Sequence, residues 1–568
     1  MYLAKENERL TKAHRKYTDA LIENTLTYDG TIGQHHANLV VGQTFEQENT
    51  NTMDATGINL SQPYFLQLQN ASDWSANSFE YKHTLASYLA RLNYDFGGKY
   101  LISGIVRRDG SSRLSKDIRW DTFTSISVGW RFDQESFFPI DRNIVNMFKF
   151  RASYGELGYE AAVGDYAIQA TMARNNMTYS FGNQPITGSA VSNFVNENLS
   201  WEKRKTMNVG VDLAFFNNRI EFTAEWYKNK SQDLLYGVPV PASAGVANTS
   251  VTMNAASMEN SGLEFSLTYR NNDHALKHQI SANLSTLSNK VTSLGFGTNK
   301  YITGAYITEV GQEVGRFYGW GYQGLITTQG QLDNLNEAGR LLHNKLEQQK
   351  AEADPEYIPD LRDPGNWSYQ DGAQVGDCYY SDVNGDGQVN GDDQTVLGGG
   401  LPKVNFGLSA HLEYKIFDLS ISTFGALGYH VSDYLYNTLN SSYGYGNKSV
   451  DVLGANQWDS GTYVSSIPRT YLSNSASLAW NDLFCDRQIQ NAAYWKIANV
   501  ELGCNLPNKW FGNYVSGVRI YVSAQNLYTF TKYKGYNVDY AGGTFTPGYN
   551  FCSYPTARSF MAGINFTF

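Results

Sequence analysis

The chain has 568 residues and a net charge of −10 at pH 7, and 14% of its residues are aromatic. The aromatic content excludes a disordered chain, and the negative charge argues against a protein that neutralises nucleic-acid phosphates. The four cysteines are far apart and form no CxxC pair, which argues against a zinc or redox centre.

Two further features concern location. No run of about 18 apolar residues is present, so the sequence predicts no transmembrane helix. This absence does not exclude a membrane β-barrel, because barrel strands are apolar only at every second residue. Residues 1–20 contain neither an apolar stretch nor a small-residue cleavage site and so do not form a signal peptide. An exported protein needs one, so we expect either a protein that stays inside the cell or a fragment of a longer chain.

An alternation of apolar and polar residues dominates the remaining sequence. In the last segment Phe560, Ala562, Ile564, Phe566 and Phe568 share one face, as a strand with one apolar side requires. We predict roughly fifteen strands of about 9–13 residues, the length that crosses a bilayer when tilted. They lie near 17–28, 33–46, 82–96, 99–109, 121–133, 148–154, 208–215, 220–226, 262–270, 277–290, 403–415, 417–425, 493–505, 519–525 and 560–568.

The connections between these strands alternate in length. Short turns are expected at 96–99, 215–219 and 415–418, and long segments at 48–80, 156–198, 230–257, 292–402 and 426–492. Short turns at one end and long loops at the other are typical of outer-membrane proteins. The predicted fold is therefore all-β, a transmembrane antiparallel β-barrel with long extracellular loops.

One helix is predicted inside the 292–402 loop. Leu332, Leu335, Leu342 and Leu346 recur at roughly helical spacing in a charged stretch, and Pro355 follows it. This pattern indicates a short amphipathic helix over 331–352.

The strongest motif for a bound ion is the segment 382–393, DVNGDGQVNGDD. Oxygen-bearing side chains stand at positions 1, 3, 5, 9 and 12, and Gly387 stands at position 6, as in an EF-hand calcium loop. We therefore predict a structural Ca²⁺ site, to which Gln388 contributes its backbone carbonyl. Its ligands are Asp382, Asn384, Asp386, Gln388, Asn390 and Asp393. Position 12 is Asp instead of the usual Glu, and the alternative is a solvated turn rich in Asp, Asn and Gly.

No motif predicts catalysis. GxSxG, HExxH and Walker sequences are absent from the chain. The match to GxGxxG at 319–324 lies among aromatic residues and is better explained by close packing. The protein is therefore not predicted to be an enzyme, and it has no predicted catalytic or cofactor-binding residue.

Aromatic residues crowd the loops and strand ends. One interpretation is an aromatic belt at the membrane interface. The other is a binding role, in which they stack on sugars or contact peptides. The sequence does not separate these two roles. The residues are Tyr429, Tyr434, Tyr436, Tyr443, Tyr445, Trp458, Tyr463, Trp480, Tyr494 and Trp495.

Several short blocks, in order along nearly the whole chain, resemble those of one family. They are 108–114 (RDGSSRL), 150–155 (FRASYG), 199–202 (LSWE), 215–219 (FFNNR), 258–264 (MENSGLE), 317–319 (FYG), 376–377 with 382–393, 467–469 (IPR), 495–500 (WKIANV), 524–527 (AQNL) and 563–568 (GINFTF). Because it contains this whole set of blocks in order, the sequence resembles the SusC/RagA-type TonB-dependent outer-membrane transporters.

The resemblance implies a barrel of about 22 strands in outer-membrane lipid, an N-terminal plug and a TonB-binding segment. It implies a SusD-like surface lipoprotein as partner, and import of oligosaccharides or peptides driven by TonB–ExbB–ExbD through the N-terminal region. Because this sequence starts within the barrel region, we expect 1–568 to be its C-terminal part, with the 292–402 extracellular loop carrying the calcium-type loop. The signal peptide, plug and first strands would be absent.

Other functions fit the same strands. A non-transporting adhesin or structural barrel would use the same surface loops, and a siderophore or vitamin receptor would use the same machinery. A barrel enzyme with a loop-borne hydrolytic site would turn over a glycan or ester.

Overall fold

The structure is a computed structural model and describes residues 9–568 except 63, 171, 192–194, 240–242, 244–249, 296, 442–446, 471–479, 512–514 and 540–541. The chain divides into two compact units. Unit 1 comprises Met1–Leu213, Glu225–Glu259 and Gly295–Gly297, and unit 2 comprises Ala214–Ala224, Asn260–Leu294 and Thr298–Phe568. Among the described residues, sixteen strands belong to the principal sheet, where the sequence predicted roughly fifteen.

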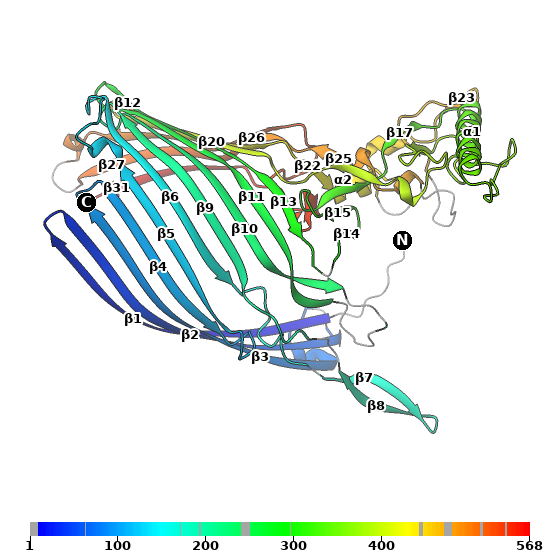
Figure 1. Cartoon of the computed structure of the whole chain (residues 1–568), viewed down its shortest axis with the longest axis horizontal. Coiled ribbons are helices and arrows are strands. Elements are labelled where there is room, and N and C mark those ends of the chain that lie inside the picture. Colours follow the sequence, from blue (N-terminus) through cyan, green and yellow to red (C-terminus); the bar gives the residue numbers. More distant parts are fainter. Residues whose placement is uncertain are drawn as a thin grey trace. The chain divides into compact units, whose positions relative to one another are not determined.

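Unit 1 is built on consecutive antiparallel strands that lie side by side in chain order (Figure 1). They are β1 (Arg9–Ile32), β2 (His35–Leu60), β3 (Ala71–Phe96), β4 (Tyr100–Ser111), β5 (Trp120–Arg131), β6 (Val145–Tyr159) and β9 (Glu202–Phe215). A separate hairpin consists of β7 (Met172–Phe181) and β8 (Gln184–Val191), and β10 (Ile220–Pro239) and β11 (Ser250–Asn271) have residues in both units.

The first strands are much longer than predicted. β1 has 24 residues, and β2 and β3 have 26 each. The expected long loop at 48–80 is mostly paired strand, in which Asn51 lies opposite Glu80 and Thr56 opposite Ser75. Polar residues occupy both faces there, so the hydrophobic alternation that marks a strand is missing. The expected loop at 230–257 is shortened in the same way by β10 and β11.

The predicted short turns are confirmed. At the turn between β9 and β10, Phe216, Asn217 and Asn218 all have positive φ values, of 54°, 58° and 62°. Gly97 and Gly98 adopt φ values of 61° and 68° between β3 and β4, where a side chain would be strained.

Unit 2 contains the antiparallel strands β12 (Leu276–Thr286), β20 (Val404–Tyr414), β21 (Phe417–Leu427), β26 (Tyr494–Leu506), β27 (Gly517–Thr531) and β31 (Ser559–Thr567), each paired with the next. β12 and β20 pair in register from Leu276↔Tyr414 to Thr286↔Val404. Apart from β13, which pairs with β11, the segment between them therefore leaves the sheet and returns to the adjacent position, as the predicted 292–402 loop requires.

That long connection is a folded insertion. It holds β13 (Ser288–Ser293), β14 (Lys300–Thr303), β15 (Tyr306–Glu309), β16 (Arg316–Gly319), β17 (Tyr322–Leu325), α1 (Gln329–Ala353), β18 (Cys378–Tyr380) and β19 (Thr395–Gly398). The predicted helix is confirmed as α1, and the Thr328 hydroxyl caps it by accepting a hydrogen bond from the Gln331 amide at 3.1 Å. Among the described residues, no helix combines the length and the hydropathy needed to cross a membrane.

Two other long connections of unit 2 are tied together by a small sheet. The first holds β22 (His430–Asp433), α2 (Tyr434–Leu439), β23 (Trp458–Asp459), β24 (Thr462–Tyr463) and β25 (Ile489–Asn491), and the second holds β28 (Gly542–Gly543), β29 (Thr546–Pro547) and β30 (Tyr549–Asn550). β22 pairs antiparallel with β25 and parallel with β30. Single 3-10 turns occur at Leu68–Asn70, Phe132–Gln134, Gly391–Asp393, Val450–Gly454, Asp486–Gln488 and Asn508–Trp510.

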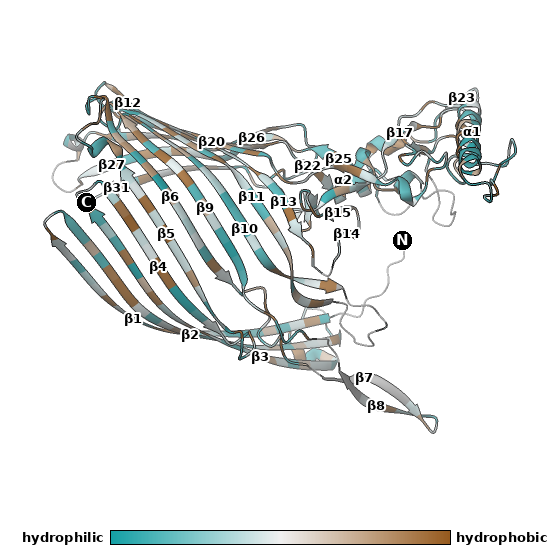
Figure 2. Cartoon of the chain, in the orientation of Figure 1, coloured by the Kyte–Doolittle hydropathy of each residue, from teal (hydrophilic) through white to brown (hydrophobic). Residues whose placement is uncertain are grey.

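The long strands alternate apolar and polar residues along their length (Figure 2). On β5, Ile126 and Val128 point to one face and are 54% and 47% exposed, while Ser125 and Ser127 point to the other. Such rows of exposed large apolar side chains are unfavourable in water and favourable in lipid. The exposed apolar face is therefore the lipid face, and the polar face lies opposite.

Candidate functional site

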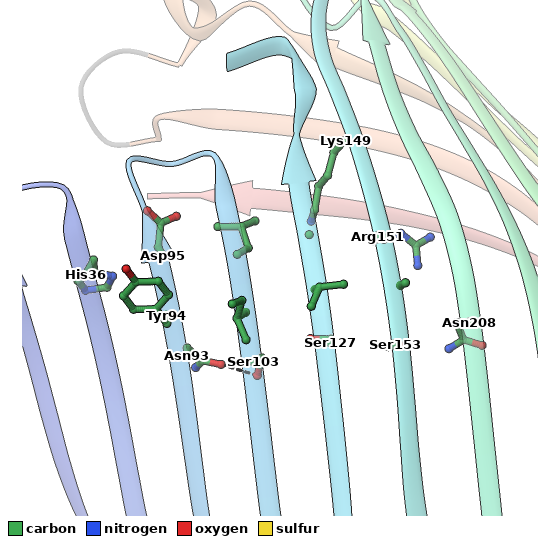
Figure 3. A pocket seen from close by; sticks show the side chains of 15 residues that line it. His36, Asn93, Tyr94, Asp95, Ser103, Ser127, Lys149, Arg151, Ser153 and Asn208 are labelled. Carbon is green, nitrogen blue, oxygen red and sulfur yellow. Dashed lines mark hydrogen bonds between the residues drawn. The ribbon is translucent and has the colours of Figure 1, made fainter. Parts of the chain in front are cut away.

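The polar face of unit 1 carries a continuous row of short polar side chains, which we call the polar row. Its members lie directly opposite one another on six neighbouring strands and are Asp29, Asn38, Asn93, Ser103, Ser127 and Ser153. The Asn38 amide donates a hydrogen bond to the Asp29 carboxylate at 2.9 Å. The Ser103 hydroxyl donates one to the Asn93 side-chain oxygen at 2.7 Å (Figure 3).

A groove of about 360 Å³ lies along the polar row, and Asn208 of β9 also lines it (Figure 3). Its cations come from β6. The Arg151 Nε lies 3.2 Å from the Asp212 carboxylate, and Arg151 also forms an ion pair with Glu225. Lys149 lines the same groove. The surface thus offers many hydroxyl and amide groups beside an arginine whose charge is compensated, which suits contact with a hydrated polar solute.

The calcium-type loop at 382–393 is a compact turn organised by its own carboxylates. Asp382 accepts hydrogen bonds from the amides of Gly385 and Gly387 at 2.6 and 2.8 Å. Asp393 accepts from the amides of Val383 and Asn390, both at 2.8 Å. The ends of the loop are thereby held together by side chains at positions 1 and 12.

The other predicted ligands lie in the same turn. Asp386 accepts from the Gln388 amide at 2.9 Å, and Asn384 accepts from the Asp386 amide at 2.8 Å. Asn390 caps the following 3-10 turn by accepting from the Asp392 amide at 2.8 Å. The structure therefore brings all six predicted ligands into one turn.

These contacts bear on whether the loop fits Ca²⁺. Within the described residues, no three His, Cys, Asp or Glu side chains are arranged to hold a metal ion as they stand. Each carboxylate oxygen has two acceptor sites, so an oxygen that accepts one amide hydrogen bond keeps a second site for a cation. The donor set of hard oxygens matches Ca²⁺ chemistry, and binding requires the carboxylates to turn toward a shared point.

The calcium-type loop packs against α1. The Trp367 indole donates to the Gly387 carbonyl at 3.0 Å and stacks on His343 with ring centroids 4.3 Å apart. A Cβ on Gly387 would lie 2.2 Å from the carbonyl oxygen of Gly339 on α1. Gly387 therefore permits both the positive φ of 90° and the close approach to the helix.

A buried ion pair joins two of the sequence blocks that carry the family resemblance. Asp377 is fully buried. Arg469 donates two hydrogen bonds to its carboxylate, from Nε at 2.5 Å and from Nη2 at 3.1 Å. The Asn481 amide and the Gln374 backbone amide donate to the same carboxylate, both at 2.9 Å. The pair connects the insertion between β12 and β20 to the connection between β21 and β26.

A second buried carboxylate fixes the C-terminal turn of α1. Glu347 accepts hydrogen bonds from Lys350 and the Tyr357 hydroxyl at 2.7 Å and from the Asp360 amide at 2.9 Å. The Lys350 contact, followed by the Asp360 amide and the Tyr357 hydroxyl, holds the pKa of Glu347 at about 2, below its ordinary value. The carboxylate therefore anchors the segment that follows the helix.

The aromatic residues have several roles. Tyr429 and Tyr463 are buried, at 3% and 1% exposure, and serve the core. Tyr434, Trp458 and Trp495 are exposed. Tyr443 and Tyr445 lie outside the described residues. Burial thus separates structural aromatics from those free to meet a ligand or lipid, which the sequence did not allow.

The polar row and the Asp377–Arg469 pair were not predicted from the sequence. The alternation in β3 to β6 gave four of the six polar positions of the row, but only the strand register aligns the six side chains. The two partners of the ion pair stand in quoted blocks, yet 92 residues separate them. Register and loop packing are the information that one-dimensional patterns lack.

The antiparallel strands with a lipid face, a polar face and alternating turn lengths define an outer-membrane β-barrel protein. Residues 4–422 match the family model described as TonB dependent receptor-like, beta-barrel. The chain belongs to this family, and its similarity to a receptor named SusC agrees with the resemblance that the sequence blocks indicate. Proteins of this family are receptors and transporters of the outer membrane, and the chain is accordingly an outer-membrane protein.

Two curated relatives and one solved structure illustrate the similarity. TonB-dependent receptor P3 of Formosa agariphila is 29% identical over 98% of this chain and 53% of its own length. TonB-dependent receptor SusC of Bacteroides thetaiotaomicron is 29% identical over 86% of this chain and 44% of its own length. The RagAB peptide transporter structure aligns with a TM-score of 0.77 at 23% identity, over 98% of this chain and 56% of that chain. The chain thus spans about half the length of these relatives.

Proposed function

We propose that the chain supplies the C-terminal part of the barrel of a TonB-dependent receptor that imports an oligosaccharide or a peptide. The observation that carries the proposal is the polar row, because it gives the sheet a hydrated face lined by hydroxyl and amide groups opposite the lipid face. A barrel with a purely structural role needs the lipid face. It does not need a groove lined by hydroxyl and amide groups that can bind a solute.

Energy coupling and a surface partner belong to the same proposal. The similarity to SusC supports a SusD-like surface lipoprotein as partner and TonB–ExbB–ExbD as the source of energy. The folded connections of unit 2, with α1 and several small sheets, offer the kind of rigid surface that a protein partner requires.

The test is deletion of the reading frame that encodes the chain in its own host. We expect loss of uptake of fluorescent oligosaccharides or of fluorescent peptides, with uptake of ferric siderophores unchanged. Affinity purification from native outer membranes should recover a surface lipoprotein with the chain. Undiminished uptake of both probe classes would refute import, and loss of siderophore uptake alone would assign the receptor to the siderophore class.

We also propose that the calcium-type loop binds one structural Ca²⁺. The support is the order of oxygen donors in 382–393, the spare acceptor sites on its carboxylates and its packing against α1. Bound calcium would rigidify the insertion between β12 and β20 and would carry out no chemistry. Limited proteolysis with calcium or with EDTA tests this proposal, and equal cleavage of the insertion in both conditions contradicts it.

A further inference from the structure

The strands β1 to β4 carry different charges on their two faces at the ends away from the short turns. Ile126 and Val128 of β5 mark the lipid face, and the strand register shows which residues of β1 to β4 share it. Exposed cations lie on this face, and together we call them the basic patch: Lys12, Lys16, Lys82 and Arg108. The polar face of the same ends of β1 and β2 carries Asp19, Glu46, Glu48 and Asp54 beside Arg9 and Arg15. The lipid face is therefore basic there, whereas the polar face is mainly acidic.

The lysines of the basic patch lie well beyond the apolar band of the lipid face. On β1 this band runs from Ile32, which is 78% exposed, to Ile22, which is 62% exposed. These ten residues of strand rise about 34 Å. At a tilt of about 40° they span about 25 Å of height, as the apolar band of an outer-membrane barrel does. Lys16 lies six residues beyond Ile22 on the same strand, and its Cα is therefore about 15 Å outside the band.

Arg108 marks the edge of the band on β4. It lies directly opposite Tyr88 on β3, and its guanidinium carbon is 5.9 Å from the centre of the Trp120 ring. The Tyr88 and Trp120 rings are stacked with their centroids 6.1 Å apart, and exposed aromatic rings of this kind are typical of the membrane interface. Lys82 lies six residues beyond Tyr88 on β3, so it is about 15 Å further out than these rings. The basic patch therefore has two levels, one at the interface and one beyond it.

The charges of the basic patch are not neutralised by carboxylates of the protein. Lys12 donates a hydrogen bond to the side-chain oxygen of Gln67 at 2.7 Å, and this partner is neutral. Glu80 lies on the same face and accepts a hydrogen bond from the Asn49 amide at 3.0 Å. Among the described residues, no carboxylate lies within 4.0 Å of the ammonium group of Lys16 or Lys82. Exposed cations without a counterion beside a membrane attract anionic lipid headgroups.

We propose that the basic patch binds the anionic headgroup of a phosphorylated glycolipid of the outer leaflet. Arg108 contacts a phosphate at the level of the interface, and Lys12, Lys16 and Lys82 contact anionic groups on the sugar part about 15 Å further out. A phospholipid is too short, because the headgroup region adds only about 5–8 Å to each side of the hydrocarbon core. The inference goes beyond the proposed import function and does not depend on it.

The test measures the binding of purified lipopolysaccharide, a phosphorylated glycolipid, by the complete receptor in detergent. Lys16→Gln/Lys82→Gln should lose about twentyfold in affinity, and Arg108→Gln about fivefold, because each basic residue beside an anionic headgroup contributes roughly fivefold. Arg9→Gln/Arg15→Gln removes two exposed cations from the polar face of β1 and is the matched control, which should bind as the native receptor does. Binding by the native receptor should weaken as the salt concentration rises.

Three further probes separate the possible sources of the anion. Lipopolysaccharide treated with phosphatase should bind the native receptor at least tenfold more weakly. Phosphatidylglycerol that binds as tightly as lipopolysaccharide would assign the patch to phospholipids, and displacement of lipopolysaccharide by inorganic phosphate would assign it to the free ion, so either result overturns the inference.

Unchanged affinity of Lys16→Gln/Lys82→Gln, or an equal loss in Arg9→Gln/Arg15→Gln, also overturns the inference. So does binding by the native receptor that ignores salt or phosphatase treatment. Thermal melting checks that each variant is folded. The salt and phosphatase measurements use the native receptor, so the inference stays falsifiable if a variant does not fold.

Discussion

Replacing Arg469 with Met should open the contact between two long connections of unit 2. The substitution keeps most of the volume of the side chain but removes two of the four hydrogen bonds to the Asp377 carboxylate. The remaining donors are the Asn481 amide and one backbone amide, and both are uncharged. Asp377 would stay fully buried as an uncompensated anion.

The expected cost follows from that burial. Removing one partner of a buried ion pair costs about 3–5 kcal/mol, because the remaining charge is left without a counterion. Since about 1.4 kcal/mol corresponds to a factor of ten, local opening should become roughly a hundred to several thousand times more frequent. Asp377→Asn together with Arg469→Met removes both charges and should restore most of the loss.

Hydrogen exchange of the purified receptor is the assay. Amides near 374–378 and 463–469 should lose protection in Arg469→Met and regain it in the double variant, while amides of β20 and β21 keep theirs. A loss of less than about tenfold in protection, or a double variant as open as the single one, would refute the view that the ion pair holds the connections together.

Three further predictions concern other elements. Acidification should release the segment after α1. Because the pKa of Glu347 is lowered to about 2 in the folded protein, its contribution to stability is fully present above about pH 4.3, the pKa of Glu in an unfolded chain. That contribution is lost as the pH falls toward about 2. Amide exchange at 345–360 should rise in this window, and Glu347→Gln should remove the pH dependence. Gly387→Ala should loosen the calcium-type loop from α1 and expose it to protease, whereas Gly385→Ala, which has positive φ but open space around its Cβ, should cost only about 1–3 kcal/mol of strain. Trp201→Ala should destabilise unit 1 by about 3–5 kcal/mol, measured by denaturant unfolding, because Trp201 is 3% exposed in the core around Phe123.

Period-two alternation was sufficient to predict the fold class. It marked β5, β6, β20, β21 and β31, whose two faces differ in polarity. It failed on the outer part of β2, because successive residues such as Asn51 and Thr52 point to opposite faces and are both polar, and backbone pairing holds the strand there. Strand length beyond the lipid is set by hydrogen bonding, which leaves no hydrophobic trace in the sequence.

The candidate sites were predicted unevenly. The calcium-type loop is local, so the spacing of Asp382 and Asp393 was enough to place both in one turn. The polar row depends on the register of six strands, and the small sheet of unit 2 depends on the parallel pairing of β22 with β30 across more than a hundred residues. Contacts of such sequence separation carry no local signal and need the folded chain.

Under the proposed import function, the short side chains of the polar row would also set the resistance that a moving solute meets. Neighbouring strands lie about 4.8 Å apart and same-face residues on one strand about 6.7 Å apart, so hydroxyl and amide positions such as Ser103, Ser127 and Ser153 form a fine grid. A solute crossing this grid exchanges one hydrogen bond of about 1 kcal/mol for the next, and no single position holds it as a deep trap. A wall of long Lys or Arg side chains would bind the solute more tightly and release it more slowly. If the proposed import takes place along this face, the serines would favour fast passage of the solute over tight binding.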